Sequence, residues 1–297
     1  MNPRMPEIGI ALAAYRPDPA FFREQLQSLI DQTVKNWICV VTFDSELTQV
    51  GIDDPRIHFI QNPSRLGHVK NFEAAAQACL RMAPGIRAVA FCDQDDLWYP
   101  GKLQRLKETL FALPPFSAVH SNMNLLFPEG ARVNGWDYEG RKVENIDLPS
   151  IVLKNVCTGA SALFDAELFR KYPIIPAGLP DHDHWFAMLA VAFGRLVGIP
   201  EPLYDYRQHH TNVIGAQEKA GWLKLRKKWT LRSLANHLGR MNKNYRQIVS
   251  ALPVPETMKQ DLLSFWTILR TTIRALNSRN TMLARAGVGT LLGFFTR

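Results

Sequence analysis

The first 113 residues alternate between short apolar runs and segments with helical spacing, and this alternation constrains the fold more than any other feature of the chain. Apolar runs of strand length lie at 7–15, 37–44, 56–63 and 86–93. Apolar residues recur at helical intervals in the segments 19–33, 67–82 and 100–113. Strands that alternate with helices predict βαβ units and a mainly parallel sheet covered by helices on both faces. The predicted fold class is therefore α/β.

Polar or aromatic side chains follow the predicted strands at the point where each strand ends. They are Tyr15, Asp44, Asn62 and the acidic stretch 93–96. In an open α/β sheet, ligands bind outside the carboxyl ends of the strands. We therefore expect these side chains to lie along one edge of the sheet and to outline a binding site there.

The stretch FCDQDDLW at 91–98 places three carboxylates within four positions, directly behind an apolar run. Mg²⁺ and Mn²⁺ prefer oxygen ligands and commonly bridge one or two carboxylates to substrate phosphates. The D-x-D spacing of Asp93 and Asp95 can point both carboxylates the same way at the end of a strand. We therefore expect a divalent metal that carries a nucleotide diphosphate. The alternative is an acidic turn in which Asp96 caps the following helix.

Size and cysteine content are consistent with an ordinary folded protein. A chain of 297 residues accommodates one large α/β domain with an appendage, or two smaller domains. The four widely spaced cysteines indicate neither a disulfide framework nor a metal site, so we expect a reducing, cytoplasmic location. The N-terminal stretch resembles a first strand rather than a signal peptide. No apolar stretch reaches the roughly 18 to 20 residues that span a bilayer.

The net charge of +8 comes from the C-terminal end of the chain. Residues 217–297 hold 15 Lys and Arg against 3 Asp and Glu, a charge of about +12, which leaves about −4 for the remainder. In 222–249, aromatic and aliphatic residues interleave with basic ones. This pattern suits an anionic membrane surface, where each basic residue contributes about 1 kcal/mol. Nucleic acid binding or one solvated face of a helical bundle would require a similar composition. We therefore divide the chain into a domain at 1–216 and a basic helical region at 217–297.

Five blocks, in order, resemble the inverting family 2 glycosyltransferases, which have a GT-A fold. FCDQDDLWYPGKL resembles the metal-binding stretch of that family, in the form characteristic of its bacterial polysaccharide and rhamnosyltransferase-like branch. ALAAYRPDPAFFREQLQSLIDQT is similar to the family's first strand, nucleotide loop and helix, and NPSRLGHVKNF to its loop before the second crossover helix. LPDHDHWFAMLAVAFG and EPLYDYRQHHTNVIG look like its catalytic and closing motifs. The resemblance covers most of residues 7–215.

The resemblance implies a metal-dependent, inverting hexosyltransferase. It would move a sugar, with rhamnose as one candidate, from a UDP- or dTDP-linked donor to a surface-polysaccharide or lipopolysaccharide acceptor. Mn²⁺ or Mg²⁺ would be the cofactor, and the acceptor would be a glycan or a lipid-linked glycan. The enzyme would then work at the inner face of the cell membrane, with its basic C-terminal region on anionic lipid. No nucleic acid partner is expected.

Residue roles also follow from the resemblance. Asp183 is the expected catalytic base, because the His-Asp-x-Trp match registers on it, and Asp181 is the competing candidate or a helix cap. Asp95 would be the principal metal ligand, with His209 and Asp93 beside it, and Asp93 would alternatively reach the ribose. Arg65 is either a diphosphate ligand or a solvated loop residue. The donor's nucleotide and diphosphate would be held by Tyr15, Asp44, Arg65, Asp93, Arg207 and Gln208.

The second predicted strand departs from the family pattern. The family usually ends this strand with paired acids and Gly-Ser, whereas this chain has TFDSEL, with Phe43 in the pair, so the base contact is left open. Gly159 and Ala160 would let the backbone approach the sugar or acceptor closely. On spacing alone His182 and His184 could be metal ligands, but they flank the start of a helix and are expected either to support nearby ligands or to be exposed. Three tryptophans would supply apolar faces to a sugar or pack in the core: Trp98, Trp136 and Trp185.

Two other functional classes remain open on the sequence alone. A carboxylate-pair glycoside hydrolase would need neither metal nor nucleotide, so chelators would not inhibit it. A basic nucleic-acid-binding protein would show strong, salt-dependent affinity located in 217–297. Neither class accounts for five ordered family blocks.

Overall fold

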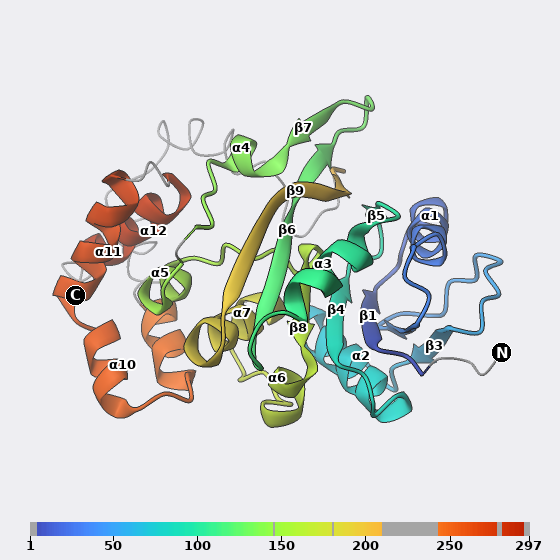
Figure 1. Cartoon of the computed structure of the whole chain (residues 1–297), viewed down its shortest axis with the longest axis horizontal. Helices are drawn as coiled ribbons and strands as arrows, with labels where there is room; N and C mark the ends of the chain where they lie inside the picture. Colours follow the sequence, from blue (N-terminus) through green and yellow to red (C-terminus); the bar gives the residue numbers. More distant parts are fainter. Residues whose placement is uncertain (1–4, 145, 180, 210–242, 278–280, 294–297) are drawn as a thin grey trace.

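A computed structural model describes residues 5–144, 146–179, 181–209, 243–277 and 281–293 (Figure 1). Its strands are β1 (Ile8–Ala14), β2 (Trp37–Phe43), β3 (Ile57–Gln61), β4 (Ala88–Cys92), β5 (Leu97–Trp98), β6 (Ala118–Leu126), β7 (Arg132–Asn134), β8 (Ala162–Asp165) and β9 (Leu196–Arg207). They form one sheet in the order β3-β2-β1-β4-β8-β6-β9-β5, and β7 pairs with β6. The predicted α/β class is confirmed.

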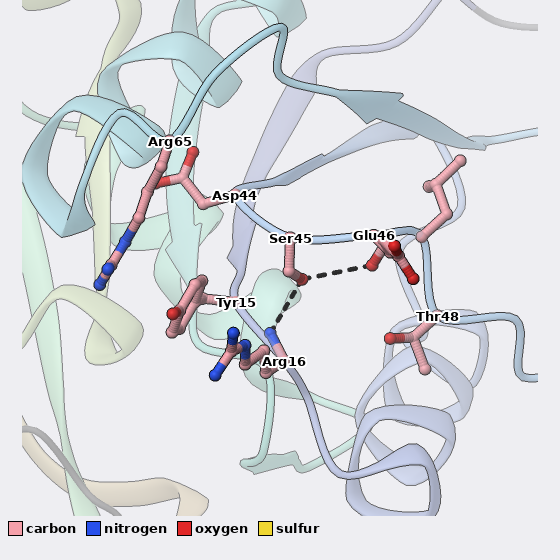
Figure 2. Close-up of a pocket in the computed structure, with 8 residues that line it drawn as sticks. Tyr15, Arg16, Asp44, Ser45, Glu46, Thr48 and Arg65 are labelled. Atoms are coloured by element: carbon pink, nitrogen blue, oxygen red, sulfur yellow. Dashed lines mark hydrogen bonds between the residues drawn. The ribbon is translucent and has the colours of Figure 1, made fainter.

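The first four strands of this order pair in parallel, as the alternating pattern predicts. β1 and β2 end side by side at the edge that Figure 2 shows in close-up, where Tyr15 and Asp44 follow them. Beyond β4 the sheet is mixed, because β8 runs antiparallel to both of its neighbours and β5 runs antiparallel to β9. Antiparallel neighbours need no crossover helix, so these strands follow irregular connections and turns that carry no alternating signal.

Three helices lie close to the predicted segments 19–33, 67–82 and 100–113: α1 (Pro19–Ile30), α2 (His68–Met82) and α3 (Lys102–Leu110). Further described helices are α4 (Gly135–Glu139), α5 (Leu148–Leu153), α6 (Ala166–Lys171), α7 (His182–Phe193), α10 (Glu256–Leu262), α11 (Phe265–Asn277) and α12 (Thr281–Gly293). Asp18 starts α1 by accepting hydrogen bonds from the backbone N–H groups of Ala20 and Phe21. The polar segment at 128–149 contains β7 and α4.

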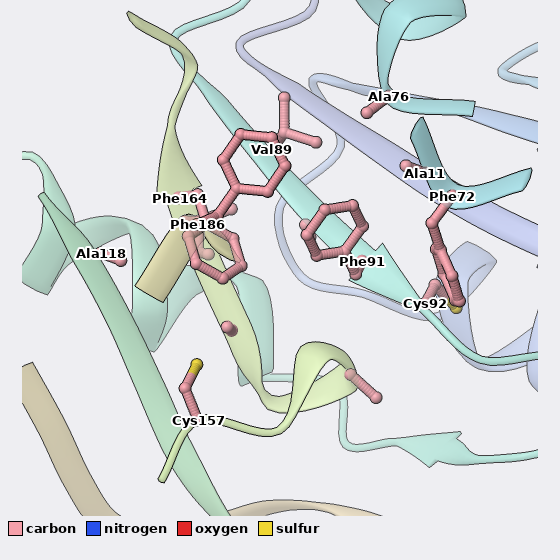
Figure 3. Close-up of a cluster of buried hydrophobic side chains, with 14 of the residues drawn as sticks. Ala11, Phe72, Ala76, Val89, Phe91, Cys92, Ala118, Cys157, Phe164 and Phe186 are labelled. Atoms are coloured by element: carbon pink, nitrogen blue, oxygen red, sulfur yellow. The ribbon is translucent and has the colours of Figure 1, made fainter. Parts of the chain in front are cut away.

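The core lies around β4, whose residues are all buried (Figure 3). The Phe91 ring packs edge-on against Phe72 of α2 and Phe164 of β8, both with centroids 5.5 Å away. Phe186 of α7 lies 5.9 Å from the same ring. These contacts fix α2 and α7 relative to the end of β4, where the acidic turn begins. The three tryptophans considered as sugar platforms, Trp98, Trp136 and Trp185, are all buried.

The C-terminal helices share the core of the rest of the molecule. Tyr245, Val249 and Leu252 are buried in the same cluster as the sheet residues, and the Tyr245 hydroxyl donates to Leu262 O at 2.6 Å. Most of the aromatic–basic pattern, at 222–242, lies outside the described residues, as does the predicted domain boundary at 216. The division into two domains therefore stays a prediction. None of the described helices has the length and apolarity needed to cross a bilayer.

Candidate active site

The carboxyl ends of four strands meet at one edge and are fastened to one another. The Tyr15 N–H, after β1, donates to Gln94 Oε1 in the acidic turn at 2.9 Å. The Asp44 N–H, after β2, donates to Ala14 O at 2.9 Å. The backbone N–H of Arg207, at the end of β9, donates to Asp96 Oδ1 at 3.3 Å. The expected gathering of polar side chains at this edge is thus present.

The acidic turn places its carboxylates in different surroundings. Asp95 is half-buried, and its Oδ2 lies 2.7 Å from His209 Nε2. Burial and the charges of Asp95 and Asp183 raise the pKa of Asp93 to about 7. Asp96 is fully buried, and burial followed by repulsion from its acidic neighbours raises its pKa well above the usual value. Gly101 is the N-cap residue of α3, so the alternative in which Asp96 caps this helix is not observed.

This donor set fits a divalent cation held jointly with a substrate. Within the described ranges, no three His, Cys, Asp or Glu side chains form a ready-made metal cluster. Mg²⁺ and Mn²⁺ sites commonly use only one or two protein ligands and complete their coordination with substrate phosphates and water. Asp95 and His209 already meet, and burial, followed by repulsion from Asp95 and Asp183, raises the pKa of Asp93; a cation would relieve the repulsion. The residues therefore suit Mn²⁺ or Mg²⁺.

A cleft of about 650 Å³ lies beside the ends of β1 and β2 (Figure 2). The Arg65 guanidinium lies 4.4 Å from the centre of the Tyr15 ring, and that of Arg16 lies 5.3 Å from it. The Arg16 N–H donates to Ser45 Oγ at 3.0 Å, and this hydrogen bond holds the Arg16 backbone at a φ of 46°. The cleft is lined by Tyr15, Arg16, Asp44, Ser45, Glu46, Leu47, Thr48 and Arg65. It thus combines an aromatic face with cations, as a nucleotide would require.

The Asp44 carboxylate fastens the loop that carries Arg65. Its Oδ1 accepts from Asn62 Nδ2 at 2.6 Å and from the Leu66 N–H at 3.1 Å, and its Oδ2 accepts from the Gly67 N–H at 2.6 Å. Gly67 has a φ of +84°, a conformation that glycine adopts without strain. Asp44 therefore orders the loop before α2, and its contact with the donor base stays a prediction.

Asp183 lies at the start of α7 with its carboxylate held by three N–H donors. Asn155 Nδ2 and the His184 N–H donate to Oδ1 at 2.9 and 2.6 Å, and the Gly159 N–H donates to Oδ2 at 2.6 Å. Burial, followed by the charge of Asp181, raises the pKa of Asp183 to about 7, although the hydrogen bonds from Gly159 and His184 oppose this rise. Asp181 occupies the N-cap position of α7, but its side chain makes no capping hydrogen bond.

Gly159 permits the close approach between the turn at 159–161 and the start of α7. A Cβ at this position would lie 2.9 Å from His182 Nε2 and 3.3 Å from Asp183 Oδ2. His182 cannot easily yield, because its buried ring stacks on Phe72 with centroids 3.8 Å apart. His184 is also buried, with Nε2 2.6 Å from Ile151 O, so the alternative in which these histidines are exposed is wrong. The absence of a side chain at Gly159 therefore allows Asp183 to lie this close to the turn.

Arg207 and Gln208, expected at the diphosphate, have protein partners in this structure. The Arg207 guanidinium donates to Asp95 O at 2.9 Å and to Glu24 Oε2 at 2.6 Å. Gln208 is buried, and its Nε2 donates to Tyr206 O at 3.4 Å. Arg207 therefore ties the acidic turn to α1 and β9, and the diphosphate roles of both residues stay predictions.

Several residues that shape the site were not predicted as site residues. Gln94 clamps the end of β1, since its Nε2 also donates to Tyr15 O at 3.4 Å. Arg141 Nη1 donates to Val156 O at 2.7 Å and to Thr158 Oγ1 at 3.0 Å, and so orders the segment before Gly159. The other two such residues are Asn155 and Lys102.

The fold and the sequence can be compared with known proteins. The model of the family described as Glycosyl transferase family 2 matches residues 10–172. Among curated proteins, the chain is 26% identical over 135 residues to the "Uncharacterized protein y4gI" of Sinorhizobium fredii. That match covers 43% of this chain but only 14% of the relative.

Solved structures of glycosyltransferases are similar over almost the whole chain. The structure of S. aureus TarS residues 1–349 in complex with UDP-GlcNAc has a TM-score of 0.59 at 12% identity, covering 96% of this chain and 90% of that one. The mannosyltransferase PcManGT of Pyrobaculum calidifontis, in complex with GDP-Man and Mn²⁺, has a TM-score of 0.54 at 17% identity, covering 97% and 87%. At these identities the likeness concerns the fold, and it confirms the expected GT-A architecture.

Proposed function

The chain belongs to glycosyl transferase family 2, and we propose that it moves a sugar from a nucleoside-diphosphate donor to a glycan or lipid-linked acceptor with inversion at the anomeric carbon. One observation carries this proposal. The Asp95 carboxylate meets the His209 imidazole at 2.7 Å, on the strand edge that also bears the cleft beside Tyr15. The family match favours a transferase over the hydrolase and nucleic-acid-binding alternatives.

In the proposed donor complex, the nucleotide lies in the cleft against Tyr15 and Arg65, and Asp95 and His209 hold Mn²⁺ or Mg²⁺. When bound, this cation neutralises charge on the departing diphosphate. Asp93 then reaches either the cation or the ribose. The carboxylate cluster supports this arrangement, because repulsion from Asp95 and Asp183 adds to burial in raising the pKa of Asp93, and a cation there would offset that repulsion.

Asp183 is the proposed base. As the acceptor oxygen attacks the anomeric carbon, the bond from that carbon to the diphosphate oxygen breaks, and the acceptor's hydroxyl proton passes to Asp183. A carboxylate offers about four lone-pair sites, and three here already accept N–H groups. The site left on Oδ2 is therefore the natural place for the proton. A pKa of about 7 suits a base that works near neutral pH.

The donor we propose is UDP- or dTDP-linked, and dTDP-rhamnose is the first sugar nucleotide to test. This choice rests on the resemblance of FCDQDDLWYPGKL to the rhamnosyltransferase-like branch, and surface polysaccharide or lipopolysaccharide is the corresponding acceptor class. GDP belongs in the same panel, because the PcManGT structure holds GDP-Man with Mn²⁺.

We also propose that the basic region at 217–297 rests on the inner face of an anionic membrane, where lipid-linked acceptors are reached. Three side chains of α11 support this proposal, since Trp266, Arg270 and Ile273 are all exposed and recur at helical spacing. Exposed aromatic and aliphatic groups beside a cation suit the headgroup region of a bilayer. The division of the chain at 216/217 is part of this proposal.

Calorimetric titration tests the proposed function. UDP, dTDP and GDP are titrated with Mn²⁺ and then with chelator, into wild type, Asp95→Ala and Asp31→Ala. We expect one nucleotide to bind only with metal, to be lost in Asp95→Ala, and to be retained in Asp31→Ala. Asp31 is an exposed residue at the far end of α1, so it controls for the loss of one carboxylate. Failure of folded wild type to bind any of the three nucleotides would overturn the proposal.

A further inference from the structure

Lys102, at the start of α3, is fully buried directly behind the acidic turn. Its ammonium lies 3.6 Å from the centre of the Trp98 ring and 4.1 Å from that of Tyr204. Lysine is seldom fully buried, because an ammonium loses its hydration unless protein groups replace it. The position of Lys102 therefore calls for a specific reason.

Two kinds of group replace the lost hydration. The aromatic faces of Trp98 and Tyr204 attract the ammonium from the side. The charges of Asp93 and Asp96 attract it from the acidic turn, and Lys102 in return lowers the pKa of both carboxyl groups. Burial lowers the pKa of Lys102 to about 7 in spite of these charges. Its Nζ is held in one place between β5, β9 and the acidic turn.

The hydrogen bond made by this ammonium leads to the catalytic base. Lys102 Nζ donates to Ala160 O, in the short turn Gly159–Ser161. The adjacent Gly159 N–H donates to Asp183 Oδ2 at 2.6 Å. Within this turn, the Ser161 N–H donates to Thr158 O at 2.9 Å. Lys102 connects the turn to α3 and the sheet.

We propose that Lys102 is a positioning residue for the base: by holding the Ala160 carbonyl, it keeps the Gly159 N–H directed at Asp183. An apolar side chain of equal length would leave that buried carbonyl without this donor, and the turn could then rotate. The inference rests on the proposed role of Asp183. It adds that a lysine behind the metal-binding turn fixes the geometry of the base on the neighbouring segment.

The test compares Lys102→Met with Lys107→Met in full-length protein. Lys107 lies on the same helix but forms a partly exposed ion pair with Glu7, away from the site. The assay follows release of nucleoside diphosphate from whichever sugar nucleotide of the UDP, dTDP and GDP series wild type uses, with water as acceptor. Sugar nucleotide and Mn²⁺ are kept saturating for every variant, so that a change in their affinity does not enter kcat. In Lys102→Met we expect kcat to fall about tenfold or more.

A second readout distinguishes positioning from general damage. Because the Gly159 hydrogen bond lowers the pKa of Asp183, its loss should move the acidic limb of the kcat profile to higher pH. Amide hydrogen exchange over residues 157–163 should become faster in Lys102→Met, while exchange over β1 and β2 stays as in wild type. Lys107→Met should change none of these values.

The outcomes separate the two proposals. If wild type neither binds nor turns over any of the nucleotides, the proposed function fails. If wild type is active and Lys102→Met keeps its kcat, pH profile and exchange at 157–163, the role of Lys102 is refuted. Should the methionine variant not fold, Lys102→Gln retains an N–H donor of shorter reach and is expected to change kcat and exchange in the same direction. Unchanged values in that variant would equally refute the proposal.

Discussion

Asp183 shows how its surroundings set the strength of a buried carboxylate. Burial raises its pKa to about 7, and the charge of Asp181 adds to the rise, whereas N–H groups of Gly159 and His184 limit it. The charged form is the one that accepts a proton. The fraction of molecules in which Asp183, the proposed base, is charged therefore grows as pH rises through about 7 and then levels off.

We predict that kcat/KM rises with pH along an acidic limb near 7, where both Asp183 and Asp93 gain their charge. Asp183→Asn should lose activity by about 10²- to 10⁴-fold, as expected when a general base is removed. Asp181→Asn is the matched control. It should stay active and move the limb to lower pH, because the Asp181 charge raises the pKa of Asp183. Loss of activity in Asp181→Asn, with Asp183→Asn active, would exchange the roles of the two residues.

The site residues that sequence reasoning identified are those that carry a local pattern. Asp95, His209 and Asp183 were assigned from motifs, and the structure brings the first two into contact. Lys102 lies inside the FCDQDDLWYPGKL block but received no role, and Asn155 lies outside all five blocks. Their hydrogen-bond partners are 58 and 28 positions away along the chain. A lysine at the start of an amphipathic helix is normally solvated, so only the packed structure shows that this one is buried.

At the scale of elements, the loop between β3 and α2 depends on a carboxylate from β2. Asp44 accepts three hydrogen bonds from this loop, and two of them come from the backbone N–H groups of Leu66 and Gly67 just before α2. The first backbone N–H groups of a helix have no partner within the helix, and Leu66 and Gly67 lie at this end of α2. Asp44 therefore supports the start of α2 as well as the position of Arg65.

We predict that Asp44→Ala lowers the free energy of unfolding by about 1–3 kcal/mol even without nucleotide, because three hydrogen bonds to a charged acceptor are lost in a partly exposed loop. Thermal or urea denaturation of the nucleotide-free protein measures this change. Asp53→Ala, an exposed carboxylate in the preceding segment, should leave stability unchanged. If Asp44→Ala instead weakened nucleotide binding without altering stability, Asp44 would act only through the donor base.

Elements with strong periodicity were predictable, whereas those that depend on tertiary contacts were not. The parallel strands and their crossover helices follow the alternating pattern closely. β9 contains Pro200 and Pro202, which argue against a strand in sequence because proline lacks the N–H of a ladder. The structure accommodates them by register shifts beside Asn122, whose Nδ2 donates to Pro200 O at 3.1 Å. The bulges that admit these prolines depend on β6, which no local pattern reveals.

For the molecule as a whole, charge and packing divide the chain differently. Composition separates a basic C-terminal region from the remainder, but Tyr245 and Val249 are buried in the same core as the sheet. The Gln247 side chain also donates to Ala177 O at 3.3 Å. Charge composition reflects mostly the side chains at the surface, whereas burial identifies those in the core. The same helices can therefore be basic in composition and packed on the core of the sheet. The proposed lipid-binding surface therefore belongs to helices that pack on the same core as the sheet.

The exposed face of α11 provides the last prediction. Trp266 is 67% exposed and Ile273 is 48% exposed, seven positions apart and therefore on one side of the helix. Co-sedimentation with phosphatidylglycerol vesicles should detect binding of full-length protein that weakens at high salt and is absent with phosphatidylcholine vesicles. Removing both apolar groups in Trp266→Ala/Ile273→Ala should cost about 1–2 kcal/mol, or about five- to thirtyfold in affinity.

The matched control for this surface is Ile174→Ala, which removes an exposed apolar side chain from a different part of the molecule. It should bind anionic vesicles as wild type does, because exposed apolar residues scattered singly contribute little to association. If the double variant bound as tightly as wild type, α11 would not be the contact. If wild type bound neutral and anionic vesicles alike, the excess of 15 Lys and Arg over 3 Asp and Glu in 217–297 would have no role in lipid binding. The basic residues of 217–297 would then be better explained by a protein or glycan partner, because Lys and Arg can also bind negatively charged groups on such a partner.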